Sequence, residues 1–248
     1  MDLPRSFSIR ESSHRVINPI TGEKLATMGR ALRLPAGTTV LDLCCGKGEL
    51  LCTWAREHAV SGVGVDISTV FLDAARERAV ELGVADRVAF RHDDAVGFVA
   101  DEPVDLVACV GATWIGEGVT GTVELLDRSL RPGGLMLIGE PYWRLTPPDQ
   151  ETIEACYATR PDEWRSLADL VAHFNDLGWD VVEMVLADGD SWDRYVAAQW
   201  LNVRRWLDAN PYDELAPELR ADLSESQIRY TRYLREYLGW GLFALMKR

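Results

Sequence analysis

The sequence predicts an α/β protein, a doubly wound sheet of mostly parallel strands with helices on both faces. Three observations lead to this fold class. Short apolar runs alternate with helical stretches through the middle of the chain. A Gly-containing turn follows the first of these runs. The chain has 248 residues, of which 47% are hydrophobic, and this is enough for one core with an added cap.

Two strand–helix units open the predicted sheet. Residues 38–43 form a β-branched apolar run, and residues 49–58 follow a helical pattern after the turn. Residues 62–65 repeat the strand signal, Ser68 is the expected N-cap of the next helix, and that helix closes on Gly83. Because a helix follows each strand, we expect the two strands to run parallel.

The same alternation continues to residue 139. Strands are expected at residues 87–91, 104–110 and 134–139, with helices near residues 94–98 and 119–130. In such a sheet the carboxyl ends of the strands line the ligand crevice.

The C-terminal part departs from this plain alternation. Residues 166–177 are expected to form a helix, residues 179–186 a strand and residues 239–246 a final strand. If the last two strands are neighbours, the final strand lies antiparallel between the two before it. Residues 192–208 and 218–237 have apolar and aromatic side chains at helical spacing, which predicts amphipathic helices that form a cap.

The composition argues against several kinds of partner. Asp and Glu number 39 against 26 Lys and Arg, so the net charge of −13 disfavours nucleic acid and anionic lipid. No apolar leader opens the chain and no apolar stretch approaches roughly 18 residues, so no membrane association is expected. The five cysteines are odd in number and lack zinc spacing, which favours reduced thiols in the cytoplasm and no metal site.

Candidate ligand-binding residues follow the first two strands. Asp42 ends the first strand and could hold an ammonium group. Gly46 and Gly48 stand at the junction with the next helix, where glycine lets the backbone approach a ligand. Asp66 ends the second strand 18 positions after Gly48, close to the spacing at which an acid meets a ribose in dinucleotide folds. Asp66 could instead cap the following helix.

The next two strands end in further candidates. Asp94, with Asp93 as the alternative, could accept a hydrogen bond from an adenine amino group, although paired acids after a strand also form solvated turns. Cys109 and Trp114 bound the loop after the fourth strand, where carbonyls and an aromatic face can stabilise a sulfonium. The candidates together could bind an amino-acid tail, a ribose, an adenine and a sulfonium. This combination predicts S-adenosylmethionine (SAM) as the ligand.

In this order, the segments resemble the motif series of the class I SAM-dependent methyltransferases over residues 36–140. The matching segments are VLDLCCGKGELL, GVGVDIS, HDDA, VDLVACVGATWI and LRPGGLMLIGEPYW. They are specific as an ordered set. The family pattern D-x-G-x-G-x-G has glycine where this chain has Cys44.

The resemblance implies a Rossmann-like sheet of seven strands with the last strand antiparallel, here with a helical cap. It implies SAM as the cofactor and S-adenosylhomocysteine as the product. Cys44 of the glycine-rich loop is counted among the cofactor-binding residues. The other contacts implied by the resemblance are Asp42, Gly46 and Gly48 for the methionyl part, Asp66 for the ribose, Ile67, Asp94 and Ala95 for the adenine, and the backbone of Cys109.

More narrowly, almost the whole chain resembles the bacterial YjhP type. The segments that carry this resemblance are SHRVINP, GEPYW and DVVEMVLADGDSWDRY. The resemblance supplies no substrate. The expected organisation is N-terminal cap helices (1–35), a SAM-binding α/β core (36–140), a cap insertion (141–165), a core helix and strand (166–187), a helical cap insertion (188–237) and a final core strand (238–248).

Candidate catalytic residues have alternatives beside them. His14 lies in a polar run and could deprotonate an acceptor, or it could be a structural or exposed histidine. Glu140 ends a strand and could orient substrate or pair with an arginine such as Arg144, and Tyr142 lies just beyond it. Aromatic stripes at helical spacing are also typical of ordinary core. The expected substrate pocket comprises Trp114, Trp143, Trp192 and Tyr195.

The predicted function is therefore transfer of a methyl group from SAM to a small-molecule acceptor. Two alternatives stay open: an enzyme that cyclises SAM itself, and a non-catalytic SAM-binding partner or sensor. A nicotinamide-dependent oxidoreductase is disfavoured, because its G-x-G-x-x-G motif requires glycine where this chain has Leu51. The acceptor and the oligomeric state are not specified by the sequence.

Overall fold

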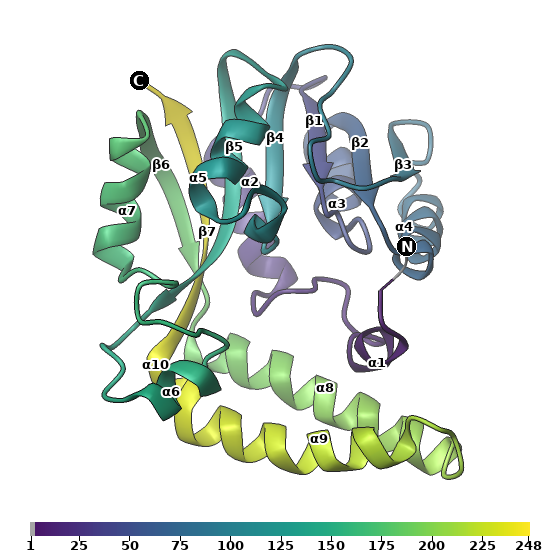
Figure 1. The fold of residues 1–248 in the computed structure, drawn as a ribbon. Coiled ribbons are helices and arrows are strands. Elements are labelled where there is room, and N and C mark those ends of the chain that lie inside the picture. The colour runs from purple at the N-terminus through teal and green to yellow at the C-terminus, as the bar shows by residue number, and fades with distance from the viewer. Residues whose placement is uncertain (1–2) are drawn as a thin grey trace.

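The computed structural model describes residues 3–248, whose strands form one sheet of seven (Figure 1). The strand order is β3-β2-β1-β4-β5-β7-β6. Neighbours from β3 to β5 are parallel, whereas β7 is antiparallel to both β5 and β6, which confirms the predicted place of the last strand. The strands are β1 (Thr39–Leu43), β2 (Ser61–Asp66), β3 (Val88–His92), β4 (Val104–Val110), β5 (Leu130–Trp143), β6 (Trp179–Leu186) and β7 (Leu238–Lys247).

Helices cover both faces of the sheet, because successive strand residues point to opposite sides. Leu137 and Ala244 belong to the core under α2, α3 and α4, whereas their neighbours Ile138 and Leu245 belong to the core under α5 and α7. The helices of these two layers are α2 (Gly22–Leu32), α3 (Glu49–His58), α4 (Thr69–Glu81), α5 (Val119–Asp127) and α7 (Leu167–Asp176).

A cap lies across the carboxyl edge of the sheet, with α8 and α9 as its two long helices (Figure 1). Helix α1 packs against α8, where Ile9 meets Val203 and Leu207. The Asn202 amide also donates to the carbonyl of Arg10 at 2.8 Å. The remaining elements are α1 (Arg5–Arg10), the 3-10 helix η1 (Thr113–Gly116), α6 (Gln150–Ala155), α8 (Gly189–Ala209), α9 (Ala216–Arg229), the π-helix η2 (Tyr230–Leu234) and α10 (Arg235–Tyr237).

Side-chain caps fix where several helices begin. The Ser68 hydroxyl accepts a hydrogen bond from the Phe71 N–H, which confirms Ser68 as the N-cap of α4. Asp188 caps α8 in the same way by accepting from the Ser191 N–H at 2.8 Å. Helix α4 ends before Gly83, whose φ of +68° is the left-handed conformation expected just past a helix end.

Helix α2 corrects the prediction that residues 1–35 are cap helices. Leu25 and Met28 of this helix are buried in the core, and the helix packs against α3 and β6. The Lys24 ammonium donates to the carbonyl of Leu186 at the end of β6. The apolar side of α2 therefore covers the sheet, and only α1 of the N-terminal segment joins the cap.

Two further predictions are wrong in detail. The insertion expected to start at residue 141 starts after Trp143, because β5 continues and pairs with β7 as far as Trp143 and Leu238. Residues 94–98 form a turn instead of a helix. The Asp94 carboxylate accepts from the Val96 N–H at 2.9 Å, a local bond that competes with helix formation.

Candidate functional site

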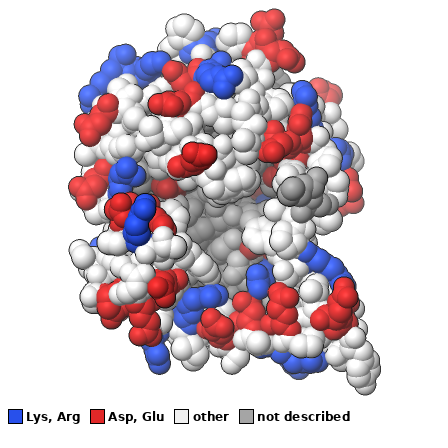
Figure 2. Space-filling view, viewed as in Figure 1, with Lys and Arg blue, Asp and Glu red and all other residues white. Residues whose placement is uncertain are grey.

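A cavity of about 200 Å³ opens at the carboxyl ends of β1, β2 and β4. The N-terminal segment that precedes α2 covers one side of it. Figure 2 shows the hollow between the sheet and the two long cap helices, with charges of both signs on its rim. The predicted ligand-binding residues on the cavity wall are Asp42, Cys44, Gly46, Asp66, Ile67, Asp94, Ala95 and Trp114.

Asp66, at the end of β2, holds the loop that follows β1. One carboxylate oxygen of Asp66 accepts from the Gly46 N–H at 2.8 Å, and the other accepts from the Ser68 N–H at 2.8 Å. Asp66 therefore stabilises both the loop and the start of α4, while it also lies on the cavity wall. The two interpretations of Asp66, as a helix cap and as a ligand contact, are compatible in this geometry.

The same loop explains why the family pattern has glycine at the position of Cys44. Cys44 adopts φ of +57°, close to the +54° of Gly46. A left-handed backbone costs about 1–2 kcal/mol for a residue with a Cβ. The chain thus keeps the backbone of the glycine pattern at Cys44 and accepts this cost. Burial and then the negative charge of Asp66 raise the pKa of the Cys44 thiol, which keeps it protonated.

Asp42 is a buried carboxyl group without a cation beside it. It is 3% exposed, and burial followed by the charge of Asp66 raises its pKa to about 8. No salt bridge within residues 3–248 includes Asp42. Two neighbouring acids on a cavity wall favour a cationic ligand, because an added positive charge offsets both burial and mutual repulsion.

Two of the predicted cofactor contacts lie off the cavity wall. Gly48 has φ of +66° and packs α3 closely, since a Cβ there would lie 2.6 Å from the Phe90 ring and 2.9 Å from Ala75. Cys109 is fully buried in the core under α5 and α7. The wall at the end of β4 is formed instead by Val110 and the two residues that follow it.

The two adjacent acids after β3 have different positions. Asp94 lies on the cavity wall, where the sequence places an adenine contact. Asp93 is not part of that wall and forms an ion pair with Arg91 at 2.8 Å. Of the two alternatives, Asp94 is therefore in position to meet a ligand.

An N-terminal strap, residues 11–20, crosses the cavity and was missed by sequence reasoning. The Asn18 amide donates to the carbonyl of Val110 at 3.0 Å, and a Cβ at Gly111 would lie 2.1 Å from the Asn18 oxygen. The Lys47 ammonium donates to the carbonyls of Glu11 and Ser12 at 2.7 and 3.1 Å. The sequence signals were the segment SHRVINP, whose place in the fold the resemblance did not give, and a lysine between Gly46 and Gly48, whose partner is 36 positions away.

The candidate base His14 lies at the start of this strap. Its ring packs on Tyr195 of α8 with the ring centroids 4.5 Å apart, and its Nδ1 lies 2.9 Å from a carboxylate oxygen of Glu11. Both ring nitrogens are buried without an aligned hydrogen bond. His14 is not on the wall of the first cavity, whereas its neighbours Arg15 and Val16 are.

Glu140 and Tyr142 lie on the side of β5 that faces the core under α5 and α7. Glu140 is 5% exposed and accepts from the Thr113 hydroxyl at 2.7 Å, and burial raises its pKa to about 7. The Arg144 partner that the sequence suggested for Glu140 binds the carbonyl of Ala187 instead. Burial raises the pKa of Tyr142, whose ring packs on Gly239 of β7. Neither residue lies on the cavity wall.

The four predicted pocket aromatics have different environments. Trp114 lies on the wall of the first cavity and is 62% exposed. Trp143 is buried, and its N–H donates to the carbonyl of Pro161 at 2.8 Å, away from both cavities. Trp192 is buried beside Tyr230, and its N–H has no hydrogen-bond partner among the described residues. The fourth aromatic residue, Tyr195, contacts His14 as described above.

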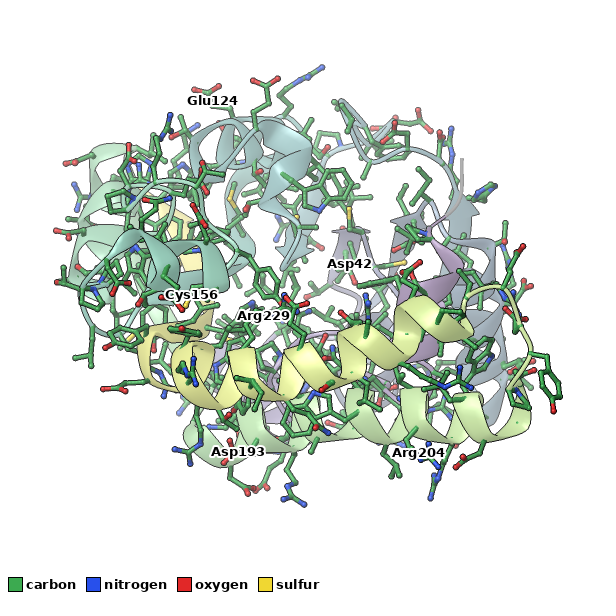
Figure 3. The ribbon with its side chains drawn as sticks, turned by 60° about the horizontal axis from the view of Figure 1, so that its bottom comes forward. Asp42, Glu124, Cys156, Asp193, Arg204 and Arg229 are labelled. Atoms are coloured by element: carbon green, nitrogen blue, oxygen red, sulfur yellow. The ribbon has the colours of Figure 1, made fainter. Side chains whose placement is uncertain are left out.

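A second cavity of about 360 Å³ lies under the cap between α1, α8 and α9. Phe7 lies on the walls of both cavities, so the two spaces adjoin. Glu11, Trp200 and Arg229 are also on the wall of the second cavity. In Figure 3, Asp42 lies in the opening between the sheet and α9, and Arg229 is on the side of α9 that faces this opening.

Two kinds of feature are absent from residues 3–248. No group of three or more histidine, cysteine or acidic side chains is placed to hold a metal ion. No helix of this part of the chain is long and apolar enough to cross a membrane.

Comparisons with known proteins agree with the fold. A family model described as a methyltransferase domain matches residues 40–134. Over 248 residues, all of both chains, the sequence is 56% identical to the uncharacterised protein YjhP of Escherichia coli (strain K12). A SAM-dependent methyltransferase from Geobacter sulfurreducens, solved with S-adenosylhomocysteine, is 61% identical with a TM-score of 0.98 and coverage of 100% of this chain and 99% of that chain. Another from Thiobacillus denitrificans, solved with the same ligand, is 58% identical with a TM-score of 0.98 and full coverage of both chains.

The chain therefore belongs to the class I SAM-dependent methyltransferases, whose seven-stranded sheet with an antiparallel last strand it shares. Within that class its similarity to YjhP extends over the full length of both chains. The resemblance found in the sequence is confirmed, and SAM is the cofactor of the family.

Proposed function

We propose that the chain transfers the methyl group of SAM to a small-molecule acceptor, with the cofactor held at the carboxyl edge of the sheet. Family membership supplies the class of reaction. The observation that carries the binding mode is the buried pair Asp42 and Asp66 at the tips of β1 and β2. The α-ammonium and sulfonium of SAM supply positive charge that Asp42 lacks within the described residues.

Different residues on the cavity wall would bind different parts of the cofactor. Asp42 would receive the ammonium group, and Asp66 the ribose hydroxyls. Asp94 would accept from the adenine amino group, with Ile67 and Ala95 against the adenine ring. Gly46 leaves the backbone bare where Ile17 of the strap closes the cavity, since a Cβ there would lie 3.1 Å from Ile17. The SAH complexes of the Geobacter and Thiobacillus relatives support a nucleoside in this cavity.

Two observations support a small acceptor. The two adjoining cavities have volumes of about 200 and 360 Å³, and α1, α8 and α9 cover the second one. The net charge of −13 disfavours a phosphate backbone in this space. The five cysteines are all free within the described residues, which supports a reducing compartment such as the cytoplasm as the place of action.

Catalysis in this arrangement depends mainly on orientation. SAM supplies an activated methyl group, and the protein holds an acceptor in line with it under a cap that limits access of water. Such positioning can contribute about 7–11 kcal/mol in favourable systems. Phe7 of α1 lines both cavities, and Glu11 of the strap and Gln199 of α8 line the second one beside it.

Methyl-labelled SAM tests this proposal. The purified protein is incubated with labelled SAM and either the low-molecular-mass or the macromolecular fraction of a cell extract. We expect label in a low-mass product together with stoichiometric S-adenosylhomocysteine. Label confined to protein or nucleic acid contradicts the small acceptor. Methylthioadenosine formed from SAM alone indicates cyclisation, and binding without turnover with either fraction indicates a sensor.

A further inference from the structure

A buried polar cluster lies where the C-terminal end of α1 meets α8. Its centre is Glu11, which is 1% exposed. The Tyr195 hydroxyl and the Gln199 amide both donate to the same oxygen, Oε1, at 3.1 and 2.7 Å. Because both α8 donors use Oε1, the other oxygen is left for His14, whose Nδ1 lies 2.9 Å from Oε2.

The surroundings specify which groups carry protons. Burial and then the charge of Glu11 raise the pKa of Tyr195 well above its usual value, so the phenol keeps its proton and donates. Glu11 is consequently an acceptor at Oε1, and its Oε2 is an acceptor beside His14. An acceptor next to Nδ1 favours the imidazole tautomer that carries hydrogen on Nδ1 and a lone pair on Nε2.

The imidazole is not yet fully hydrogen-bonded in this cluster. Nδ1 and Oε2 are close, but the carboxylate oxygen lies off the alignment of a hydrogen bond, and Nε2 has no partner within residues 3–248. The buried Nε2 needs a proton donor, and the described chain offers none.

The cluster stands at the boundary of the two cavities. Arg15 and Val16, which follow His14 directly, are on the wall of the cofactor cavity. Glu11 and Gln199 are on the wall of the cavity under the cap, and Figure 3 shows how α9 bounds the opening that leads to Asp42. His14 itself is on the wall of neither cavity, but it stands in the chain between Glu11, which lines the cavity under the cap, and Arg15, which lines the cofactor cavity.

Lys47 ties the same segment to the cofactor loop. Its ammonium donates to the carbonyls of Glu11 and Ser12, and it is only 7% exposed. Burial lowers the pKa of Lys47, and the Glu11 charge opposes this shift. The position of the Glu11–His14 pair is thus fixed relative to the loop that would hold the methionyl part.

We propose that Glu11 positions His14 as the general base of the methyl transfer, and that the acceptor is therefore a hydroxyl group or an acidic C–H group. A thiolate, an amine or a carboxylate needs no such base. His14 Nε2 takes the acceptor proton, and the electron pair of the O–H or C–H bond forms the new bond to the methyl carbon. The C–S bond breaks, and its electron pair stays on sulfur. The imidazolium is balanced by Glu11 and later releases its proton to water. This inference rests on the proposed function.

The Glu11→Gln variant separates positioning from simple packing. Its amide oxygen is needed by the two donors Tyr195 and Gln199, so its NH₂ group must face His14. A donor beside Nδ1 favours the opposite tautomer, with hydrogen on Nε2, which cannot act as a base. The readout is the ¹⁵N NMR signal of the His14 side chain, assigned with His14→Gln, in the intact protein without acceptor.

We expect the Nδ1–H tautomer in the wild-type protein and the Nε2–H tautomer in Glu11→Gln. His173→Gln is the matched control, because His173 contacts the Thr120 hydroxyl far from the cap. If Glu11→Gln fails to fold, Tyr195→Phe tests the same network, since it removes one donor from Oε1 and keeps the ring against His14. We expect the Nδ1–H tautomer to be kept in that variant, because Oε2 stays an acceptor beside Nδ1 and the carboxylate loses a competing donor; an Nε2–H tautomer there overturns the positioning role. An Nε2–H tautomer in the wild-type protein, or an unchanged tautomer in the folded Glu11→Gln variant, overturns the positioning role.

The methylated product tests the acceptor class separately. With labelled SAM and the low-mass extract, we expect an O-methyl or C-methyl product, and about 100-fold slower turnover in His14→Gln and Glu11→Gln at unchanged SAM affinity. An S-methyl or N-methyl product overturns this inference while it confirms methyl transfer. Absence of any methylated product contradicts the proposed function, whereas the tautomer measurement still decides whether Glu11 positions His14.

Discussion

At the sheet edge, Asp42 and Asp66 stand side by side, and no salt bridge among residues 3–248 supplies Asp42 with a cation. Under the cap, by contrast, Asp222 pairs with Arg10 and Asp193 pairs with Arg235, each at 2.9 Å. The first cavity thus has two neighbouring acids on strand ends, of which Asp42 has no cation beside it, whereas Arg10 and Asp222 on the wall of the second cavity compensate each other.

This difference separates two tasks. A cavity with excess negative charge selects a cation whatever the acceptor is, which suits a cofactor common to a family. A cavity with paired charges distinguishes ligands by shape and by hydrogen bonds, such as the one open to the buried indole N–H of Trp200.

Asp42→Asn is expected to have the largest effect. It removes the charge opposite the ammonium of SAM, and we expect SAM affinity to fall by about 10- to 150-fold, since charged hydrogen bonds contribute about 1.5–3 kcal/mol. Isothermal calorimetry measures the change. Asp73→Asn, at an exposed ion pair of α4, is the control and should bind SAM normally.

The same variant should stabilise the protein without ligand. The pKa of Asp42 is raised from 3.8 to about 8, so the folded state resists ionisation that the unfolded chain undergoes freely. The contribution of Asp42 therefore lowers the free energy of unfolding of the wild type as pH rises from about 4 to about 8, and this contribution changes little above pH 8. Thermal melts should show Asp42→Asn gaining most on the wild type at pH 8 and nothing at pH 4. A constant gap across this range contradicts the assignment.

Asp66→Ala should reduce both stability and binding. The Gly46 and Ser68 N–H groups lose their acceptor, which costs about 1–3 kcal/mol for each group that stays buried. SAM affinity should fall at least about tenfold because the ribose contact is lost. Denaturant unfolding and calorimetry measure the two effects. If the variant loses stability but keeps its SAM affinity, Asp66 stabilises the loop and does not contact the ribose.

Gly111→Ala tests the strap over the cofactor cavity. Gly111 has φ of +85°, and a Cβ would lie 2.1 Å from the side-chain oxygen of Asn18. We expect destabilisation by about 1–2 kcal/mol from the backbone and a further loss from the displaced strap. Asn18→Ala in the same chain should restore the second part. Additive losses in the double variant, measured by denaturant unfolding, would show that the two residues do not interact.

Cys44→Gly has the smallest expected effect. It removes the strain of a left-handed non-glycine residue, worth about 1–2 kcal/mol, and adds chain entropy to the unfolded state that offsets about 0.5–1 kcal/mol. We expect a net stabilisation below about 1 kcal/mol. Cys45→Gly, at a neighbouring position with no positive φ, should destabilise instead.

The sheet and the strand-end acids could be predicted because each depends on short-range pattern. Parallel strands place their carboxyl ends at one edge, so Asp42, Asp66 and Asp94 were brought together by topology alone. The position of β7 followed from the order of the last three strands.

The failures concern tertiary contacts between distant segments. Gly48 packs on Phe90 of β3. The glycine-rich motif alone therefore could not show whether Gly48 is needed for this packing or for contact with a ligand. An amphipathic stripe on α2 is the same whether it faces a sheet or a cap. Glu11 and Gln199 are 188 positions apart, and no local signal connects them.

Proton release on SAM binding, measured by calorimetry in buffers of different ionisation enthalpy, is the most direct test of the cation site. At a pH below the Asp42 pKa of about 8, the cationic ligand should drive ionisation of Asp42 and release about one proton per bound SAM. Any SAM binding that remains in Asp42→Asn should release none. Equal proton release by the wild type and this variant would contradict the account, because the charge of SAM would then be balanced elsewhere.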